Sequence, residues 1–156
     1  MCKMNERQVI TVACVDQPLV YADRFRLAQR ILNERAGRRQ GEKLLHSYQP
    51  FQFDFRSALE ARFVIYQFLI TDMRLSDPFD FYDDFRIGPN NLSRGAYIAR
   101  LAKEKNPDIV TILLSGGADQ ISEDEKESFD FTVLKGVESY YRVIMLMEQY
   151  VKEKDK

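Results

Sequence analysis

The sequence is poor in the residues that build disulfide scaffolds and metal clusters. Its 156 residues include two cysteines and one histidine. Cys2 and Cys14 are too few and too far apart to staple a small fold or form a zinc site. Cys14 lies in an apolar run, where we expect a small core residue. His46 has no ligand pattern around it, so we expect it to be structural or incidental.

Long apolar runs and an excess of one charge are also absent. No stretch approaches the ~20 apolar residues of a membrane span, and the opening MCKMNERQ lacks the apolar core of a signal peptide. We therefore expect a cytoplasmic protein with no membrane partner. The net charge is −1, so no global field favours nucleic acid. A composition that is 45% hydrophobic and 30% charged is typical of a globular domain.

The hydrophobic pattern alternates between strand-like and helix-like stretches. Continuous apolar runs are typical of strands covered on both faces of a parallel sheet, and they occur at 8–15, 64–70, 109–114 and 131–134. Residues 43–53 are less regular and can hold one more strand, interrupted by Pro50. Helical spacing indicates helices after Pro18, at 55–63, at 92–105, near Ser122 and over 137–153. The last helix is expected to bury a stripe of Val137, Tyr141, Ile144, Met147 and Val151.

This alternation predicts an α/β fold, a doubly wound five-stranded parallel sheet with helices on both faces. We expect one domain over 8–153, preceded by a tail at 1–7. Residues 76–91 form an acidic and aromatic insertion, longer than the ~2–6-residue connections usual in such folds. It is either a binding loop or a solvated insertion whose aromatic side chains pack onto the domain.

Polar residues directly follow four of the predicted strands: Asp16, Asp72, Ser115 and Lys135. In a parallel sheet these strand ends share one edge, the edge at which open α/β sheets bind ligands. The carboxylate of Asp72 can instead simply cap the next turn or helix. Two carboxylates can hold Mg²⁺, and a carboxylate can attack a phosphoryl group. A lysine supplies positive charge for phosphate oxygens, so the set is coherent with phosphoryl transfer.

At these positions the chain resembles the receiver domain of two-component response regulators, of the chemotaxis-regulator kind. The resemblance covers roughly residues 8–150 and implies a flavodoxin-like strand order 2-1-3-4-5. The stretches that carry it are VD at 15–16, LITDMRLS at 69–76, Gly95, LLSGG at 113–117 and LKG at 134–136.

The resemblance implies a role for each site residue. Asp72 would be the phosphoacceptor, and Mg²⁺ would be bound by Asp72, Asp16 and the backbone carbonyl of Arg74. Ser115 would sense the phosphoryl group and Lys135 would pair with it. A histidine kinase or phosphotransfer protein would donate the group, and a downstream protein target would be contacted directly, since no effector domain follows.

Several positions depart from the family pattern. Gln17 stands where a second acid is usual, so either an acid from the 76–91 insertion substitutes for it or Mg²⁺ is bound weakly. Gly136 replaces the usual proline after the lysine. Thr132 occupies the position of the aromatic switch residue, with Phe131 beside it. Gly95 follows Asp72 by 95 − 72 = 23 positions, a longer connection than usual.

Three functions are compatible with these residues. The first is a single-domain receiver that accepts a phosphoryl group and is not otherwise an enzyme. The second is a receiver-like adaptor that binds partners without phosphorylation, which Gln17 and the insertion favour. The third is a phosphatase of the haloacid-dehalogenase type. Its motif needs a second aspartate two residues on, where this chain has Arg74 and Pro18, so it ranks last.

Overall fold

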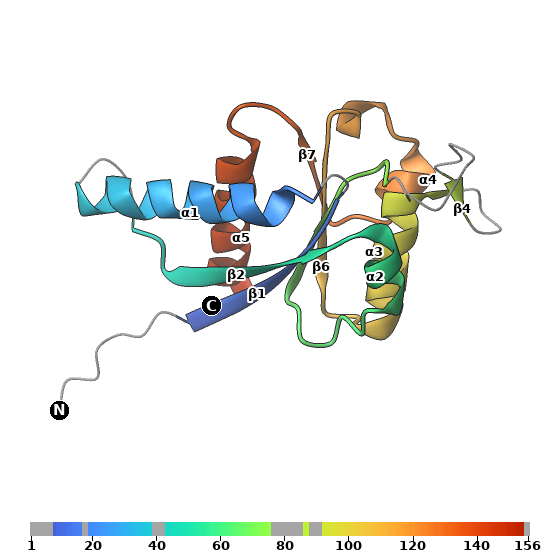
Figure 1. Ribbon diagram of the computed structural model, residues 1–156, viewed down its shortest axis with the longest axis horizontal. Coiled ribbons are helices and arrows are strands. Elements are labelled where there is room, and N and C mark those ends of the chain that lie inside the picture. The colour runs from blue at the N-terminus through green and yellow to red at the C-terminus, as the bar shows by residue number, and fades with distance from the viewer. Residues whose placement is uncertain (1–7, 17–18, 39–42, 76–85, 88–91, 155–156) are drawn as a thin grey trace.

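The computed structural model describes residues 8–16, 19–38, 43–75, 86–87 and 92–154. Its centre is a five-stranded sheet in the order β2-β1-β3-β6-β7 (Figure 1), and all four neighbouring pairs are parallel. Counted along these strands alone the order is 2-1-3-4-5, so the predicted fold class and strand order are confirmed. The strands are β1 (Gln8–Val15), β2 (His46–Phe53), β3 (Phe68–Thr71), β6 (Val110–Ser115) and β7 (Phe131–Leu134).

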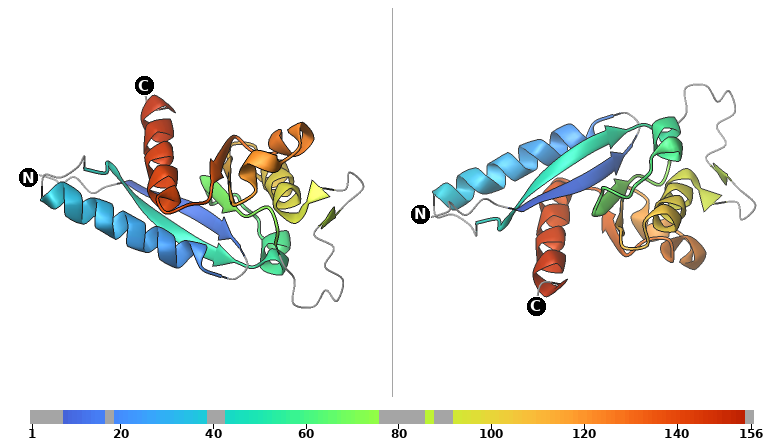
Figure 2. Two further views of the ribbon diagram at one scale, coloured as in Figure 1. Left: turned by 90° about the horizontal axis from the view of Figure 1, so that it is seen from above. Right: turned by 90° about the horizontal axis from the view of Figure 1, so that it is seen from below.

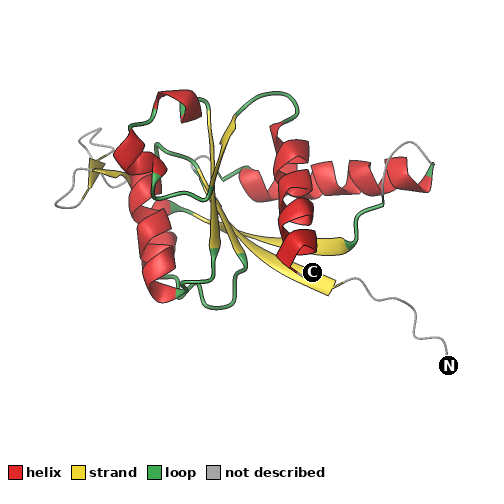
Figure 3. Ribbon diagram, turned by 180° about the vertical axis from the view of Figure 1, so that it is seen from behind, coloured by secondary structure: helices red, strands yellow, loops and turns green. Residues whose placement is uncertain are grey.

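Helices cover both faces of this sheet. Helices α1 (Tyr21–Gly37) and α5 (Ser139–Lys154) lie together on one side, and α2 (Phe55–Glu60) and α3 (Arg94–Lys105) lie on the other (Figures 1 and 3). A 3-10 turn, η1 (Ala118–Gln120), and the short α4 (Glu123–Lys126) connect β6 to β7. Outside the main sheet, β4 (Arg86–Ile87) pairs antiparallel with β5 (Leu92–Ser93).

The two faces of the sheet build two separate cores. In β1, Val12 and Cys14 pack on the side of α1 and α5, while Ala13 and Val15 pack on the side of α2 and α3. All four are fully buried, which explains why the strand reads as a continuous apolar run. The core position expected for Cys14 is confirmed. Burying a side chain of the size of valine contributes about 1.5–3 kcal/mol.

The edge strand β2 runs without a break through Pro50. It pairs with β1 over its whole length (Figure 2). Within β2, the backbone N–H and carbonyl of Tyr48 point away from β1 and form hydrogen bonds with the side-chain amide of Gln29. Pro50 shares that outward orientation, because its carbonyl accepts from Arg26. A proline is tolerated on an edge strand where its missing N–H would point away from the sheet.

Some predicted boundaries are wrong. The central strand begins at Phe68, since Val64 and Ile65 are 62% and 66% exposed in a turn that follows Phe63, which has a positive φ of 64°. The last helix begins at Ser139, and Val137 is 97% exposed, outside the apolar stripe.

The third helix begins at Arg94 rather than at 92, because Ser93 caps it by accepting from the backbone N–H of Ala96. The tail at 1–7 and most of the 76–91 insertion lie outside the described residues. No helix in the described part of the chain is long and apolar enough to cross a membrane.

A buried carboxylate joins α5 to the start of β2. Glu148 accepts hydrogen bonds from the backbone N–H groups of Leu45 and His46, from the Tyr48 hydroxyl and from Nδ1 of His46, at 2.8–3.1 Å. His46 is thus part of a structural contact. Burial alone would raise the pKa of Glu148, but these hydrogen bonds outweigh it and lower the pKa from its ordinary 4.5.

Replacing Glu148 by glutamine is expected to lower the free energy of unfolding by about 2 kcal/mol, because the amide presents a donor to groups that all donate. Since the folded-state pKa of Glu148 is lowered, its stabilisation is present above the ordinary 4.5 and is lost as the pH falls through the lowered value. Urea unfolding at several pH values measures both effects. Glu153→Gln, at an exposed position of the same helix, is the control. Equal free energies of unfolding for Glu148→Gln and Glu153→Gln would show that the Glu148 carboxylate does not stabilise the fold.

Candidate functional site

The carboxyl edge of the sheet brings two distant residues into contact. Lys135 Nζ lies 3.3 Å from Asp72 Oδ2, although the residues are 63 positions apart. Asp72 follows β3 and Lys135 follows β7, and β6 lies between these strands. Ser115 ends β6 and its carbonyl accepts from the backbone N–H of Lys135 at 3.0 Å. Three of the four predicted positions are therefore neighbours at one edge.

The carboxylate of Asp72 is held in place but remains accessible. Its Oδ1 accepts from the backbone N–H of Met73 at 2.7 Å, and its own N–H donates to the carbonyl of Val15 at 3.1 Å. The side chain is 17% exposed, against 35% for Lys135. A partly exposed carboxylate with a fixed orientation and an adjacent cation is suited to receive a small anionic group.

The start of α3 rests directly against the backbone of Asp72. The N–H of Gly95 donates to the Met73 carbonyl at 3.0 Å. A Cβ at Gly95 would lie 2.0 Å from the Asp72 carbonyl oxygen, a distance no side chain can adopt. Glycine is required here by the close approach of two backbones. This contact places Gly95 beside Asp72, although the two residues are 23 positions apart in the sequence.

Asp16 has a different environment. It is buried, and its Oδ2 accepts from the N–H groups of Val20 at 2.9 Å and Tyr21 at 3.0 Å, so it caps α1. Its Oδ1 accepts from the amide of Gln52. Burial raises the pKa of Asp16, and the hydrogen bonds from Val20, Gln52 and Tyr21 oppose the shift. Asp16 thus holds the first turn of α1, a contact that was not predicted for it; the capping alternative had been raised for Asp72.

The donor set fits a loosely held Mg²⁺ rather than a closed metal cage. The Asp72 carboxylate accepts from the Met73 N–H and from Lys135 Nζ and is 17% exposed, whereas the buried Asp16 uses Oδ2 for two backbone N–H groups. No cluster of three or more histidine, cysteine, aspartate or glutamate side chains occurs among the residues that the structure describes. Gln17 lies outside them. Mg²⁺ binding by Asp72, Asp16 and the Arg74 carbonyl stays a prediction, and Mg²⁺ needs only one or two carboxylates besides water.

Two contributors to the site were not predicted. Tyr21 opens α1, donates its hydroxyl to the carbonyl of Leu114, and places its ring 4.8 Å from Lys135 Nζ. Gln52 reaches from β2 to Asp16. Tyr21 reaches the site because of where α1 begins after β1, and Gln52 reaches it from the neighbouring strand β2. No spacing in the sequence indicates either contact.

The structure also shows how Thr132, at the position of the aromatic switch residue, and its neighbour Phe131 are oriented. Thr132 is exposed on β7, whereas the neighbouring Phe131 turns toward α5 and stacks edge-on against Tyr150 at 6.2 Å. Phe131 is therefore tied to the core.

The fold matches solved receiver structures. A scan against protein-family models finds no match, and a search of curated proteins finds no similar sequence. A CheY-like receiver domain protein from Methanospirillum hungatei is 11% identical, with a TM-score of 0.56 over 95% of this chain and 98% of that chain. A receiver domain protein from Clostridium thermocellum is 16% identical, with a TM-score of 0.57 over 94% and 97%.

The signal receiver domain of an HD-domain-containing protein from Pseudomonas fluorescens is 12% identical, with a TM-score of 0.58 over 95% of this chain and 98% of that chain. The chain therefore has the CheY-like receiver fold, and the resemblance noted from the sequence is confirmed at the level of the fold. At these identities the comparison establishes the fold alone.

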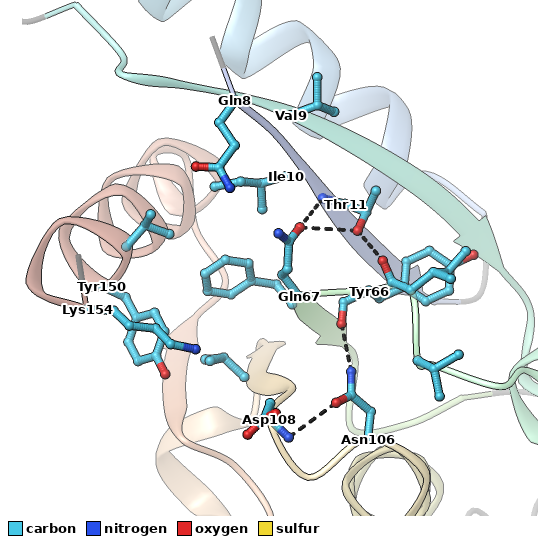
Figure 4. Close-up of a pocket in the computed structure, with 15 residues that line it drawn as sticks. Gln8, Val9, Ile10, Thr11, Tyr66, Gln67, Asn106, Asp108, Tyr150 and Lys154 are labelled. Atoms are coloured by element: carbon cyan, nitrogen blue, oxygen red, sulfur yellow. Dashed lines mark hydrogen bonds between the residues drawn. The ribbon is translucent and has the colours of Figure 1, made fainter.

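A separate groove lies at the opposite edge of the sheet (Figure 4). It has a volume of about 630 Å³ and is lined at the starts of β1, β3 and β6. It exists because β1 pairs with β3 only from Val12 onward. Beside the groove the Thr11 N–H is met by the side-chain oxygen of Gln67 at 2.7 Å instead of by a strand (Figure 4). Its lining does not include Asp72, Ser115 or Lys135.

Gly95→Ala is expected to destabilise the chain by about 2–3 kcal/mol, because a methyl group would be forced into the Asp72 carbonyl. Gly116→Ala is the matched control, since a Cβ there meets nothing within 4 Å. Thermal unfolding of both variants measures the difference. A Gly95→Ala variant as stable as Gly116→Ala would show that α3 does not approach the site this closely.

Proposed function

We propose that the chain is a response-regulator receiver domain that accepts a phosphoryl group on Asp72. The observation that carries the proposal is the 3.3 Å contact between Asp72 Oδ2 and Lys135 Nζ at the carboxyl edge of the sheet. The donor would be a cytoplasmic histidine kinase or phosphotransfer protein. The output would be a contact with a downstream protein.

The reaction assigns one task to each residue. An oxygen of Asp72 attacks phosphorus, a new O–P bond forms, and the bond from phosphorus to the donor breaks, with its electron pair leaving on the donor. The ammonium of Lys135 pairs with the phosphoryl oxygens. Ser115 accepts from the N–H of Gly117 at 3.3 Å, which uses its oxygen and not its proton, so the hydroxyl can donate to the new group. Mg²⁺, when bound, would neutralise charge on the transferring group.

The added charge would then redistribute contacts. A phosphoryl group on Asp72 attracts Ser115 and Lys135, which lie at the ends of β6 and β7. The connections that follow these strands would move with them and alter the surface offered to a partner. The position of Lys135 before α5 links the site to that helix.

Incubation with Mg²⁺ and acetyl phosphate is expected to add the mass of one phosphoryl group, read by intact mass spectrometry. Asp72→Asn should abolish the adduct, because an amide is not a nucleophile here. Asp130→Asn is the matched control, since Asp130 also pairs with a lysine, at 2.7 Å from Lys103 Nζ, yet lies away from the site. No adduct in the unmodified chain, or one that persists in Asp72→Asn, contradicts the proposal.

Lys135→Gln is expected to slow formation of the adduct by about tenfold or more, because it removes the cation that faces the transferred group. The initial rate with acetyl phosphate measures this. A rate within twofold of the unmodified chain would remove Lys135 from the mechanism.

A second candidate is the phosphorylation-independent adaptor. The cap that Asp16 makes on α1 favours it, because a carboxylate committed to a helix is less available to Mg²⁺. This candidate predicts no adduct at any Mg²⁺ concentration, together with partner binding that Asp72→Asn leaves unchanged.

A further inference from the structure

Tyr21 is buried where α1 meets the edge of the sheet that carries Asp72. It is 2% exposed, and its ring packs edge-on against Tyr140 of α5 at 5.9 Å. Its hydroxyl donates to the carbonyl of Leu114, the residue before Ser115. Its ring lies 4.8 Å from Lys135 Nζ. Tyr21 therefore contacts two neighbours of Asp72 at once, the end of β6 and the side chain of Lys135.

We propose that Tyr21 is a positioning residue, which holds the Lys135 ammonium and the end of β6 in register with Asp72. The part of the proposal that concerns phosphoryl transfer rests on the proposed function. The part that concerns Lys135 stands on the geometry alone.

The ring restrains a side chain that would otherwise be mobile. Lys135 has four rotatable bonds and a point charge, and fixing it costs conformational entropy. The face of an aromatic ring attracts a cation within about 6 Å of its centroid. Here the ammonium contacts that ring and Asp72 Oδ2 at once. The ammonium is therefore placed before any phosphoryl group arrives, which is the condition for electrostatic preorganisation.

The hydroxyl of Tyr21 fixes the end of β6, which carries Ser115. By donating to Leu114 it ties the first turn of α1 to the end of β6, one residue before Ser115. The ordinary pKa of a tyrosine hydroxyl is about 10, so the phenol keeps its proton and remains a donor at neutral pH. The Tyr21 hydroxyl can therefore donate to the Leu114 carbonyl throughout the neutral pH range.

The backbone of Tyr21 is held by Asp16. Its N–H donates to Asp16 Oδ2 at 3.0 Å, so Asp16, Tyr21, Lys135 and Asp72 form a continuous series of contacts. The buried Asp16 thus has a role in the site besides any contact with a metal. Its carboxylate positions the first turn of α1, and that turn positions the ring of Tyr21.

Two variants separate the ring from the hydroxyl. Tyr21→Phe keeps the ring and removes the bond to Leu114, while Tyr21→Leu removes both. Tyr48→Phe is the matched control, because it also removes a buried hydroxyl from the same core, at the contact with Glu148 instead of at Asp72. A purely structural role predicts that all three lower stability and leave Lys135 unchanged.

The first readout is the NMR signal of the ε-methylene protons of Lys135, identified by its loss in Lys135→Arg. We expect an upfield ring-current shift in the unmodified chain, retained in Tyr21→Phe and Tyr48→Phe and lost in Tyr21→Leu. An unshifted Lys135 signal in the unmodified chain overturns the proposal, and so does a shift that survives in Tyr21→Leu.

The second readout is the initial rate of adduct formation with acetyl phosphate. Tyr21→Leu is expected to be about three- to tenfold slower, the range that loss of one cation–π contact supplies, and Tyr48→Phe to be unchanged. A Tyr21→Leu rate within twofold of the unmodified chain overturns the part of the proposal that concerns phosphoryl transfer. If no adduct forms in the unmodified chain while the ring-current shift is present, the proposed function fails and the placement of Lys135 by Tyr21 stands.

Discussion

The parallel direction of the strands is the constraint on which the site depends. It puts the ends of β1, β3, β6 and β7 at one edge, and so brings the Asp72 carboxylate to the Lys135 ammonium. An ion pair with this much solvent contact contributes only about 0–1 kcal/mol to stability. The pair is thus a poor explanation for the stability of the fold. Under the proposed function, its role is instead to present a charged site to an incoming anion.

The sequence was sufficient for most of the sheet because its inner strands β1, β3 and β6 are mainly apolar. Each inner strand feeds two cores, so its residues cannot alternate. Boundaries failed where apolar residues are exposed. Val64, Ile65 and Val137 read as strand or helix, yet they lie in connections. Hydrophobicity alone does not distinguish a buried residue from one in a turn, and the turn depends on the backbone at Phe63.

The site was predictable in its residue types and less so in its contacts. Asp72, Ser115 and Lys135 follow apolar strands, and chain direction then makes them neighbours. Asp16 follows the same rule, but its carboxylate caps α1. That outcome and the approach of Tyr21 depend on where α1 begins after β1. The contact of Glu148 with the start of β2 is similarly hidden, since it joins residues about a hundred positions apart.

The placement of Asp72 beside Lys135 is open to a direct chemical measurement. A zero-length carbodiimide joins a carboxylate to an amine only when the two are in contact, and peptide mass spectrometry identifies the linked residues. The pair formed by Asp130 and Lys103, 2.7 Å apart and with the lysine similarly exposed, serves as the internal standard. We expect Asp72 to be linked to Lys135 alongside that pair. Linkage of the standard pair with none between Asp72 and Lys135 would contradict the account.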